Sequence, residues 1–204
     1  MGEMSNLLQA ATKPRDDVLA AEAQQFVALA SPGAVLSGEQ RVALAEAARN
    51  GQTSDELETL AHHLYFEPST VHEKHVRAAA DVFGDPATVE AVGIVSRLSS
   101  VDRIHSVLDV EPEPLPDPLP GPPTGDIAPG LKRRLGFLPK PPGPIPTTLD
   151  LVPAEGNALR AMFGPMYMTE QEMGDPHFRR EPGLNTPQLE TVAARISLLN
   201  RCFY

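Results

Sequence analysis

The sequence predicts an all-α protein in which a proline-rich connector joins two helical units. Apolar residues recur every three or four positions through most of residues 16–110 and 187–199, which is helical spacing. Capping residues and Gly or Pro breaks separate these runs into helices of ordinary length. No run of alternating apolar and polar residues is long enough to indicate a strand of a sheet.

The first unit is expected over residues 16–110 as a compact helical bundle. Ser37 with Gln40 three positions later is a capping-box pattern, and Gly51 is typical of the residue that follows a helix end. The expected helices run from Asp16 or Asp17 to Ala30, from Ser37 to Asn50, from Ser54 or Asp55 to just before Pro68, from a cap at Ser69 or Thr70 to Phe83, and from Ala87 to Leu108.

The connector is expected over residues 111–146, which hold 13 of the 22 prolines. Proline at this density disfavours helix and sheet and favours an extended, semi-rigid chain. Lys132, Arg133 and Arg134 form the densest basic cluster of the sequence. This stretch is either a docking peptide for a partner or a connector that packs back on its own domain. We favour the second interpretation.

The second unit is expected over residues 147–204. A helix from Glu155 to Met168 is interrupted at Gly164-Pro165, and Pro and Gly residues predict a loop over 175–184. Thr186 can cap a final helix with Pro187 in its first turn. Asn200 is a plausible end for this helix, because Asn tolerates the left-handed conformation.

The end of this unit carries a motif that resembles a known family. Glu190, Ser197, Asn200 and Cys202 match a glutamate, a helix with small residues and a Ser, and the start of an Asn-x-Cys-x-x-Cys motif. In this respect the segment 190–204 is similar to the active site of the alkylhydroperoxidase D-like, or carboxymuconolactone decarboxylase-like, family. That resemblance implies a helical bundle of the alkylhydroperoxidase D-like kind.

The resemblance also implies a function, that of an antioxidant thiol peroxidase. In the family the second Cys of the pair attacks the hydroperoxide and the first resolves the resulting sulfenic acid, so Cys202 would be the resolving thiol. Glu190 and a downstream His would relay a proton to the leaving oxygen. The partners implied are a hydroperoxide substrate and a thiol reductant, with no metal and no other cofactor.

The same motif predicts that a second Cys and a His follow Tyr204, so that the chain would be an N-terminal portion and a poor peroxidase alone. A UGA codon that encodes selenocysteine is one physical reason for such a stop, because a selenolate is ionised at neutral pH. Sequencing past the Tyr204 codon tests both ideas. A stop codon other than UGA would exclude selenocysteine, and a downstream sequence without Cys and His would exclude the peroxidase.

A weaker internal repeat supports two units. Residues 37–41 align with 186–190 as capped helix starts, and Arg41 stands where Glu190 stands in the second copy. The run 90–108, with its Asp102-Arg103 pair, is similar to the helix that follows the active-site helices of the family. Residues 16–110 would then be a copy without catalytic residues.

Each candidate residue also has a purely structural interpretation. Cys202 could be a small buried hydrophobic residue, and Glu190 could be a first-turn glutamate that the helix dipole favours. His72 and His75 lie three apart on one helical face, which could hold a metal, but Pro68 separates them from His62 and His63. We favour a solvated helix face for these histidines.

Composition limits the class of partner. The formal charge of −10 disfavours binding to nucleic acids and to anionic membranes. A single cysteine and the lack of any apolar run of about 18 residues favour a cytoplasmic protein without a membrane span. The small core predicted for residues 16–110 favours a homo-oligomer.

Two further functions stay open. One is a non-catalytic helical module for oligomerisation or docking within the same family, for which replacing Cys202 would change nothing. The other is a lactone decarboxylase, which Cys202 mildly disfavours because such members normally lack the Cys pair.

Overall fold

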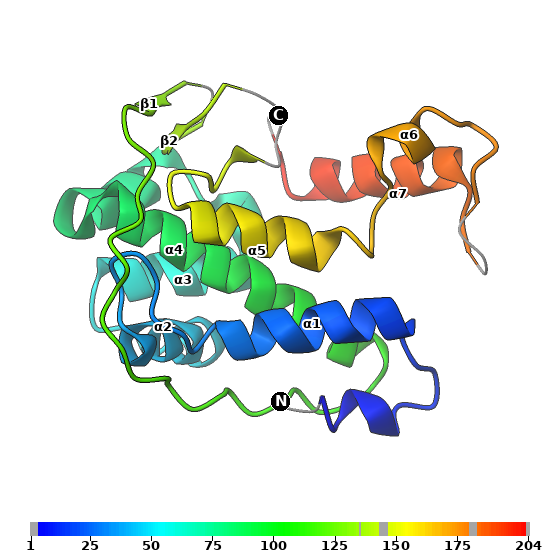
Figure 1. Ribbon diagram of the computed structural model, residues 1–204, viewed down its shortest axis with the longest axis horizontal. Coiled ribbons are helices and arrows are strands. Elements are labelled where there is room, and N and C mark those ends of the chain that lie inside the picture. The colour runs from blue at the N-terminus through cyan, green and yellow to red at the C-terminus, as the bar shows by residue number, and fades with distance from the viewer. Residues whose placement is uncertain (1–3, 135, 143–146, 180–182, 203–204) are drawn as a thin grey trace.

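The computed structural model describes residues 4–134, 136–142, 147–179 and 183–202, and within them the protein is mostly helical (Figure 1). The prediction of an all-α class is therefore confirmed. The α-helices are α1 (Asp16–Ala28), α2 (Gly38–Asn50), α3 (Glu56–Phe66), α4 (Glu73–Val107), α5 (Pro153–Phe163), α6 (Glu170–Met173) and α7 (Thr186–Leu199). Short 3-10 helices cover Leu7–Gln9 and Pro68–Thr70, and two antiparallel strands, β1 (Lys132–Arg133) and β2 (Pro139–Lys140), form a small hairpin.

Local capping chemistry sets the ends of α2 and α3 as the sequence predicts. The Ser37 hydroxyl accepts from the Gln40 backbone N–H, and the Gln40 side chain accepts in return from the Ser37 backbone N–H. Gly51 closes α2 at a φ of 70°, a left-handed conformation that suits glycine. The Asp55 carboxylate caps α3 by accepting from the N–H groups of Leu57 and Glu58. These bonds satisfy helix-end N–H groups that would otherwise have no partner.

Helix α4 differs from its prediction at one end and agrees in the middle. The cap is His72 rather than Ser69 or Thr70, because Pro68–Thr70 turns as a 3-10 helix first. At Gly84 the backbone has φ 85° and ψ 158°, so the ribbon is kinked there and consists of two helical segments. The break predicted between Phe83 and Ala87 is therefore confirmed.

Helices α1 to α5 share one hydrophobic core. α3 packs between α2 and α4, while α5 lies along α1 and α4 (Figure 1). Met162 of α5 is fully buried in the same cluster as Leu29, Leu60 and Leu98. The division into units at residues 16–110 and 147–204 stays a prediction. Helix α5 belongs to the expected second unit by its position in the sequence, but it packs on the helices of the first.

The proline-rich connector runs along the bundle and is tied to it by hydrogen bonds. The backbone N–H of Leu119 donates to Ala30 O at 2.8 Å, and that of Thr124 donates to Gly33 O at 2.9 Å. The Arg133 guanidinium bonds to both carboxylate oxygens of Asp85, at 2.9 and 3.1 Å. In its described part the connector thus packs back on its own domain.

Helix α7 stands apart from this core. Thr186 is its one buried residue, and its apolar residues from Val192 onward lie largely in solvent. In Figure 1 it projects, with α6 beside it, beyond the ends of α1 and α5. Its cap is Asn185, one position before the Thr186 that the sequence suggests, and Asn185 and Gln188 form a reciprocal capping box.

Candidate functional site

The single thiol lies just beyond the end of α7. Asn200 is the last residue before the chain turns, but it has φ −82°, and Arg201 takes the left-handed conformation at φ 51°. The expectation that Asn200 would be left-handed was therefore wrong by one position. The Cys202 N–H donates to Ser197 O at 2.9 Å, which holds the turn, and the Cys202 side chain is exposed.

This turn brings Cys202 to the edge of a groove on the bundle. The groove has a volume of about 470 Å³ and is formed by α3, α4, the β1–β2 hairpin and the turn after α7. Its walls are mainly apolar, and a thiol at such an edge can reach solvent and an apolar ligand together. The apolar side chains that line it are Leu64, Pro68, Val71, Val76, Val92, Phe137 and Leu138.

The chain is acidic overall, but the described charged residues that line this groove are basic. His72, Lys140 and Arg201 line it together with Cys202, and among the described residues no Asp or Glu does. Lys140 is 5% exposed although it carries an ammonium group, and its Nζ donates to Pro141 O at 3.4 Å. Among the described lining residues, the charged side chains are therefore cationic.

Glu190 lies at the other end of α7. Twelve residues of helix separate it from Cys202, a rise of about 18 Å. Its carboxylate accepts a hydrogen bond from the Tyr167 hydroxyl at 2.9 Å. Burial, and then the nearby Glu190 carboxylate, raise the pKa of Tyr167. The two residues suggested as catalytic are thus not brought together by this structure.

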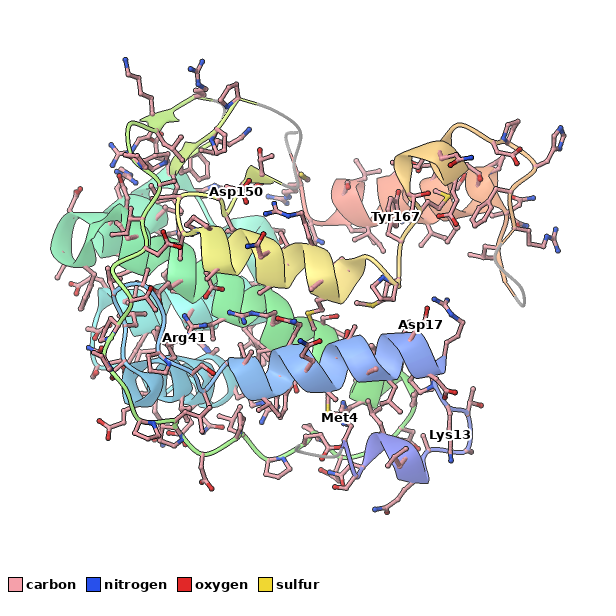
Figure 2. All side chains as sticks on the ribbon, viewed as in Figure 1. Met4, Lys13, Asp17, Arg41, Asp150 and Tyr167 are labelled. Carbon is pink, nitrogen blue, oxygen red and sulfur yellow. The ribbon has the colours of Figure 1, made fainter. Side chains whose placement is uncertain are left out.

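A second group of charged residues, which the sequence did not suggest as a site, lies inside the bundle. Arg41 of α2 pairs with Glu90 of α4 at 2.7 Å and with Glu155 of α5 at 2.8 Å, and Glu155 also pairs with Arg97. All four side chains are at most 3% exposed. Figure 2 labels Arg41, whose side chain is enclosed by the surrounding helices. Burial lowers the pKa of Arg97, and the Glu155 carboxylate opposes that shift.

This buried network is closed by backbone groups and made possible by glycines. The Arg41 Nε donates to Leu29 O at 3.2 Å, and Glu90 accepts from the Val35 N–H at 2.7 Å. A Cβ on Gly33 would lie 1.8 Å from a Glu90 oxygen, and one on Gly93 would lie 2.1 Å from a Glu155 oxygen. The cluster holds two arginines and two glutamates whose charges are paired with one another. Its role is therefore to hold α2, α4 and α5 together rather than to react.

The histidines of α3 and α4 form a loose aromatic group. The rings of His63 and His75 are 5.2 Å apart between centroids, and those of His72 and His75 are 5.9 Å apart. Desolvation, followed by the charge of Lys74, lowers the pKa of His75. Within the described residues no group of three or more His, Cys, Asp or Glu side chains is placed to hold a metal ion.

Comparison of the chain with family models, with characterised proteins and with solved structures gave no match. Among the described helices, none combines the length and the apolarity needed to cross a bilayer.

Proposed function

We propose that this chain is a thiol-dependent hydroperoxide reductase-like protein in which Cys202 is the resolving thiol. The observation that carries the proposal is the position of Cys202, exposed at the edge of an apolar groove. The match of Glu190, Ser197, Asn200 and Cys202 to the alkylhydroperoxidase D-like motif supports it. A peroxide with an apolar substituent can enter such a groove while its polar end stays near the thiol.

The chemistry requires a second redox residue, which the motif places three positions after Cys202. The thiolate or selenolate of that residue attacks the distal peroxide oxygen, the O–O bond breaks, and the alcohol leaves with a proton. The attacker becomes a sulfenic or selenenic acid. The Cys202 thiolate then attacks its sulfur or selenium, which releases water and forms a disulfide or selenenyl sulfide. A dithiol reductant returns both groups to the reduced state.

Within the described chain, His72 is the groove residue that could move a proton. It lines the groove with Cys202, and an imidazole has ring nitrogens that can both donate and accept a proton. Glu190 bonds Tyr167 instead and lies at the far end of α7. If Glu190 takes part in proton transfer, it must therefore do so at a site other than the groove beside Cys202 of its own chain.

The decisive experiment replaces Cys202 by Ser in the protein that carries the residue following Tyr204. We expect consumption of tert-butyl hydroperoxide with dithiothreitol to fall at least tenfold, while the oxidised attacker accumulates and is trapped by dimedone. Unchanged turnover without a trapped adduct would contradict the proposal, as would a coding sequence with neither Cys nor selenocysteine after the Tyr204 codon.

The second candidate function is a non-catalytic module for oligomerisation, and the surface of α7 favours it. Val192, Ile196 and Leu199 follow one stripe of the helix and are 48, 52 and 60% exposed. Leu189 continues the stripe in the direction of the helix start. Apolar residues at spacings of three and four positions form the seam by which helices pair. A second copy that brings its own α7 would cover this stripe.

Sedimentation tests this alternative. Ile196→Glu places a charge in the stripe without disturbing the core, and it should convert a self-associated chain into a monomer. Ala194→Glu is the matched control, because Ala194 is exposed on the opposite side of α7. A parent chain that is monomeric at tens of micromolar would exclude the α7 interface.

A further inference from the structure

Two apolar surfaces of this chain are open, and one is concave where the other is convex. The first is the groove beside Cys202, with a volume of about 470 Å³ and a mainly apolar described lining. The second is the stripe of α7, where Val192, Ile196 and Leu199 are 48, 52 and 60% exposed. A helix that inserts apolar residues spaced by three and four positions into an apolar groove is a common mode of recognition. Each surface is therefore of the kind that could cover the other.

Helix α7 has little support from its own bundle. It has 14 residues, and Thr186 is its one buried residue. Isolated helices shorter than about 12–15 residues are marginal in water, and most helices in proteins are stabilised by packing of an apolar face. We therefore expect the packing that stabilises α7 to come from outside its own bundle.

The position of α7 allows two copies of the chain to exchange this helix. The turn at Asn200, Arg201 and Cys202 lies at the edge of the groove, and α7 extends from this turn beyond the ends of α1 and α5 (Figure 1). A twofold axis close to the turn would place the projecting helix of each copy against the bundle of the other, on the side of the groove. Because such a contact is isologous, it covers both stripes and both grooves at once.

We propose that the groove beside Cys202 receives α7 of a second copy, so that two chains form a dimer by exchange of this helix. The proposal rests on self-association, the second candidate function, but it pairs the stripe with the groove rather than with another α7. The second copy then completes the wall of the groove. An apolar hydroperoxide and the second α7 compete for the same space, so Cys202 is shielded in the dimer.

Variants in the groove test this arrangement by sedimentation. Ser69→Trp fills the groove from the 3-10 turn and leaves the apolar side chains of the core unchanged, because Ser69 lines the groove. We expect it to raise the dissociation constant of the dimer at least tenfold, as Ile196→Glu should. Thr70→Trp is the matched control, because Thr70 is exposed beside Ser69 and lies outside the described lining. The dimer should persist in this control.

Disulfide cross-linking identifies the two surfaces directly. In a Cys202→Ser background, chains with Ser69→Cys are mixed with chains that carry Val192→Cys, Ile196→Cys or Leu199→Cys, left to exchange subunits, and oxidised with copper phenanthroline. At least one mixture should give a covalent dimer that neither of its chains gives alone.

The thiol of Cys202 gives an independent readout. Its alkylation by iodoacetamide should be at least fivefold faster in Ile196→Glu than in the dimeric parent, because the covering helix is lost. Ala194→Glu adds the same charge on the other side of α7 and should react like the parent. Equal rates in Ile196→Glu and the parent would show that the groove is open in the dimer, which contradicts the proposal.

Three further results would overturn the inference. The first is a parent chain that is monomeric at tens of micromolar, which would also exclude the second candidate function. The second is a dimer that survives Ser69→Trp but not Ile196→Glu, and the third is cross-linking of the α7 cysteine variants only with themselves. Either of the last two would leave self-association in place and assign it to pairing of α7 with α7. Hydroperoxide turnover is measured separately, and its absence bears on the peroxidase and not on the dimer.

Discussion

Glu22 of α1 is a carboxyl group sealed between helices with little to stabilise its charge. The side chain has no exposed surface, Ser100 of α4 donates to its Oε1 at 2.9 Å, and its Oε2 has no partner among the described residues. Burial raises the pKa of Glu22 to about 7, and the Ser100 hydrogen bond only partly opposes this. The folded protein therefore keeps a proton on Glu22 at a pH where the unfolded chain has released it.

The raised pKa predicts that stability falls as the pH rises. Folded Glu22 releases its proton near pH 7 and unfolded Glu22 near its ordinary value of 4.5, so the favourable contribution is complete below about 4.5 and is lost through 7. The difference between the two pKa values corresponds to a loss of unfolding free energy of roughly 3 kcal/mol at most. We expect Glu22→Gln to remove this loss, so that its urea-unfolding free energy exceeds that of the parent above pH 7.

The control for this measurement is Glu46→Gln, since Glu46 is exposed on α2. It should leave the pH profile parallel to that of the parent. A Glu22→Gln profile that also stays parallel to the parent between pH 5 and 8 would show that the carboxyl is ionised in the folded protein.

At the scale of the elements, α5 is joined to the bundle by the ion pairs of Glu155. Its carboxylate meets both Arg41 and Arg97, which belong to α2 and α4. Glu155→Gln should leave Arg97 buried without a carboxylate and destabilise the fold by about 3–5 kcal/mol in chemical unfolding. Arg160→Gln on the same helix breaks the more exposed pair with Asp150 and should cost less than about 1 kcal/mol. Equal effects of the two variants would contradict a structural role for the network.

The helices that the sequence predicted best are those with local signals. The Ser37–Gln40 capping box, Gly51 and the break at Gly84 depend on residues within four positions, and all three are found as expected. The start of α4 was misplaced, because Pro68–Thr70 forms a 3-10 turn that competes with the capping of a longer helix. The outcome of this competition depends on packing, so the capping residues alone do not predict it.

The candidate site was predictable only in part, because its parts come from distant segments. Cys202 could be singled out from the motif around it. The groove could not, since it combines Leu64, Phe137 and Lys140, which the chain separates by as many as 76 positions. The pairing of Arg41 with Glu155 is equally non-local. Buried charges gave no periodic pattern in the sequence, so only the fold reveals that they neutralise one another.

At the scale of the whole molecule, the burial pattern predicts which parts can be removed. Residues 175–204 contribute one buried residue, Thr186, among those described, so a chain ending at Gly174 should unfold at nearly the same urea concentration as the parent. A chain ending at residue 146 also loses Glu155 and Met162, which lie in the shared interior. It leaves Arg41 and Arg97 without that carboxylate and opens a cavity, two effects that each cost several kcal/mol.

The comparison of these two truncations decides where the folding unit ends. If α5 belongs to the first bundle, the chain of 174 residues keeps a cooperative transition and the chain of 146 residues loses it, as followed by helical circular dichroism. If a boundary near residue 147 separates two units, the shorter chain unfolds as cooperatively as the longer one. A loss of cooperativity already at 174 would instead mean that α7 covers part of the core, and its exposed apolar stripe would then need another explanation than self-association.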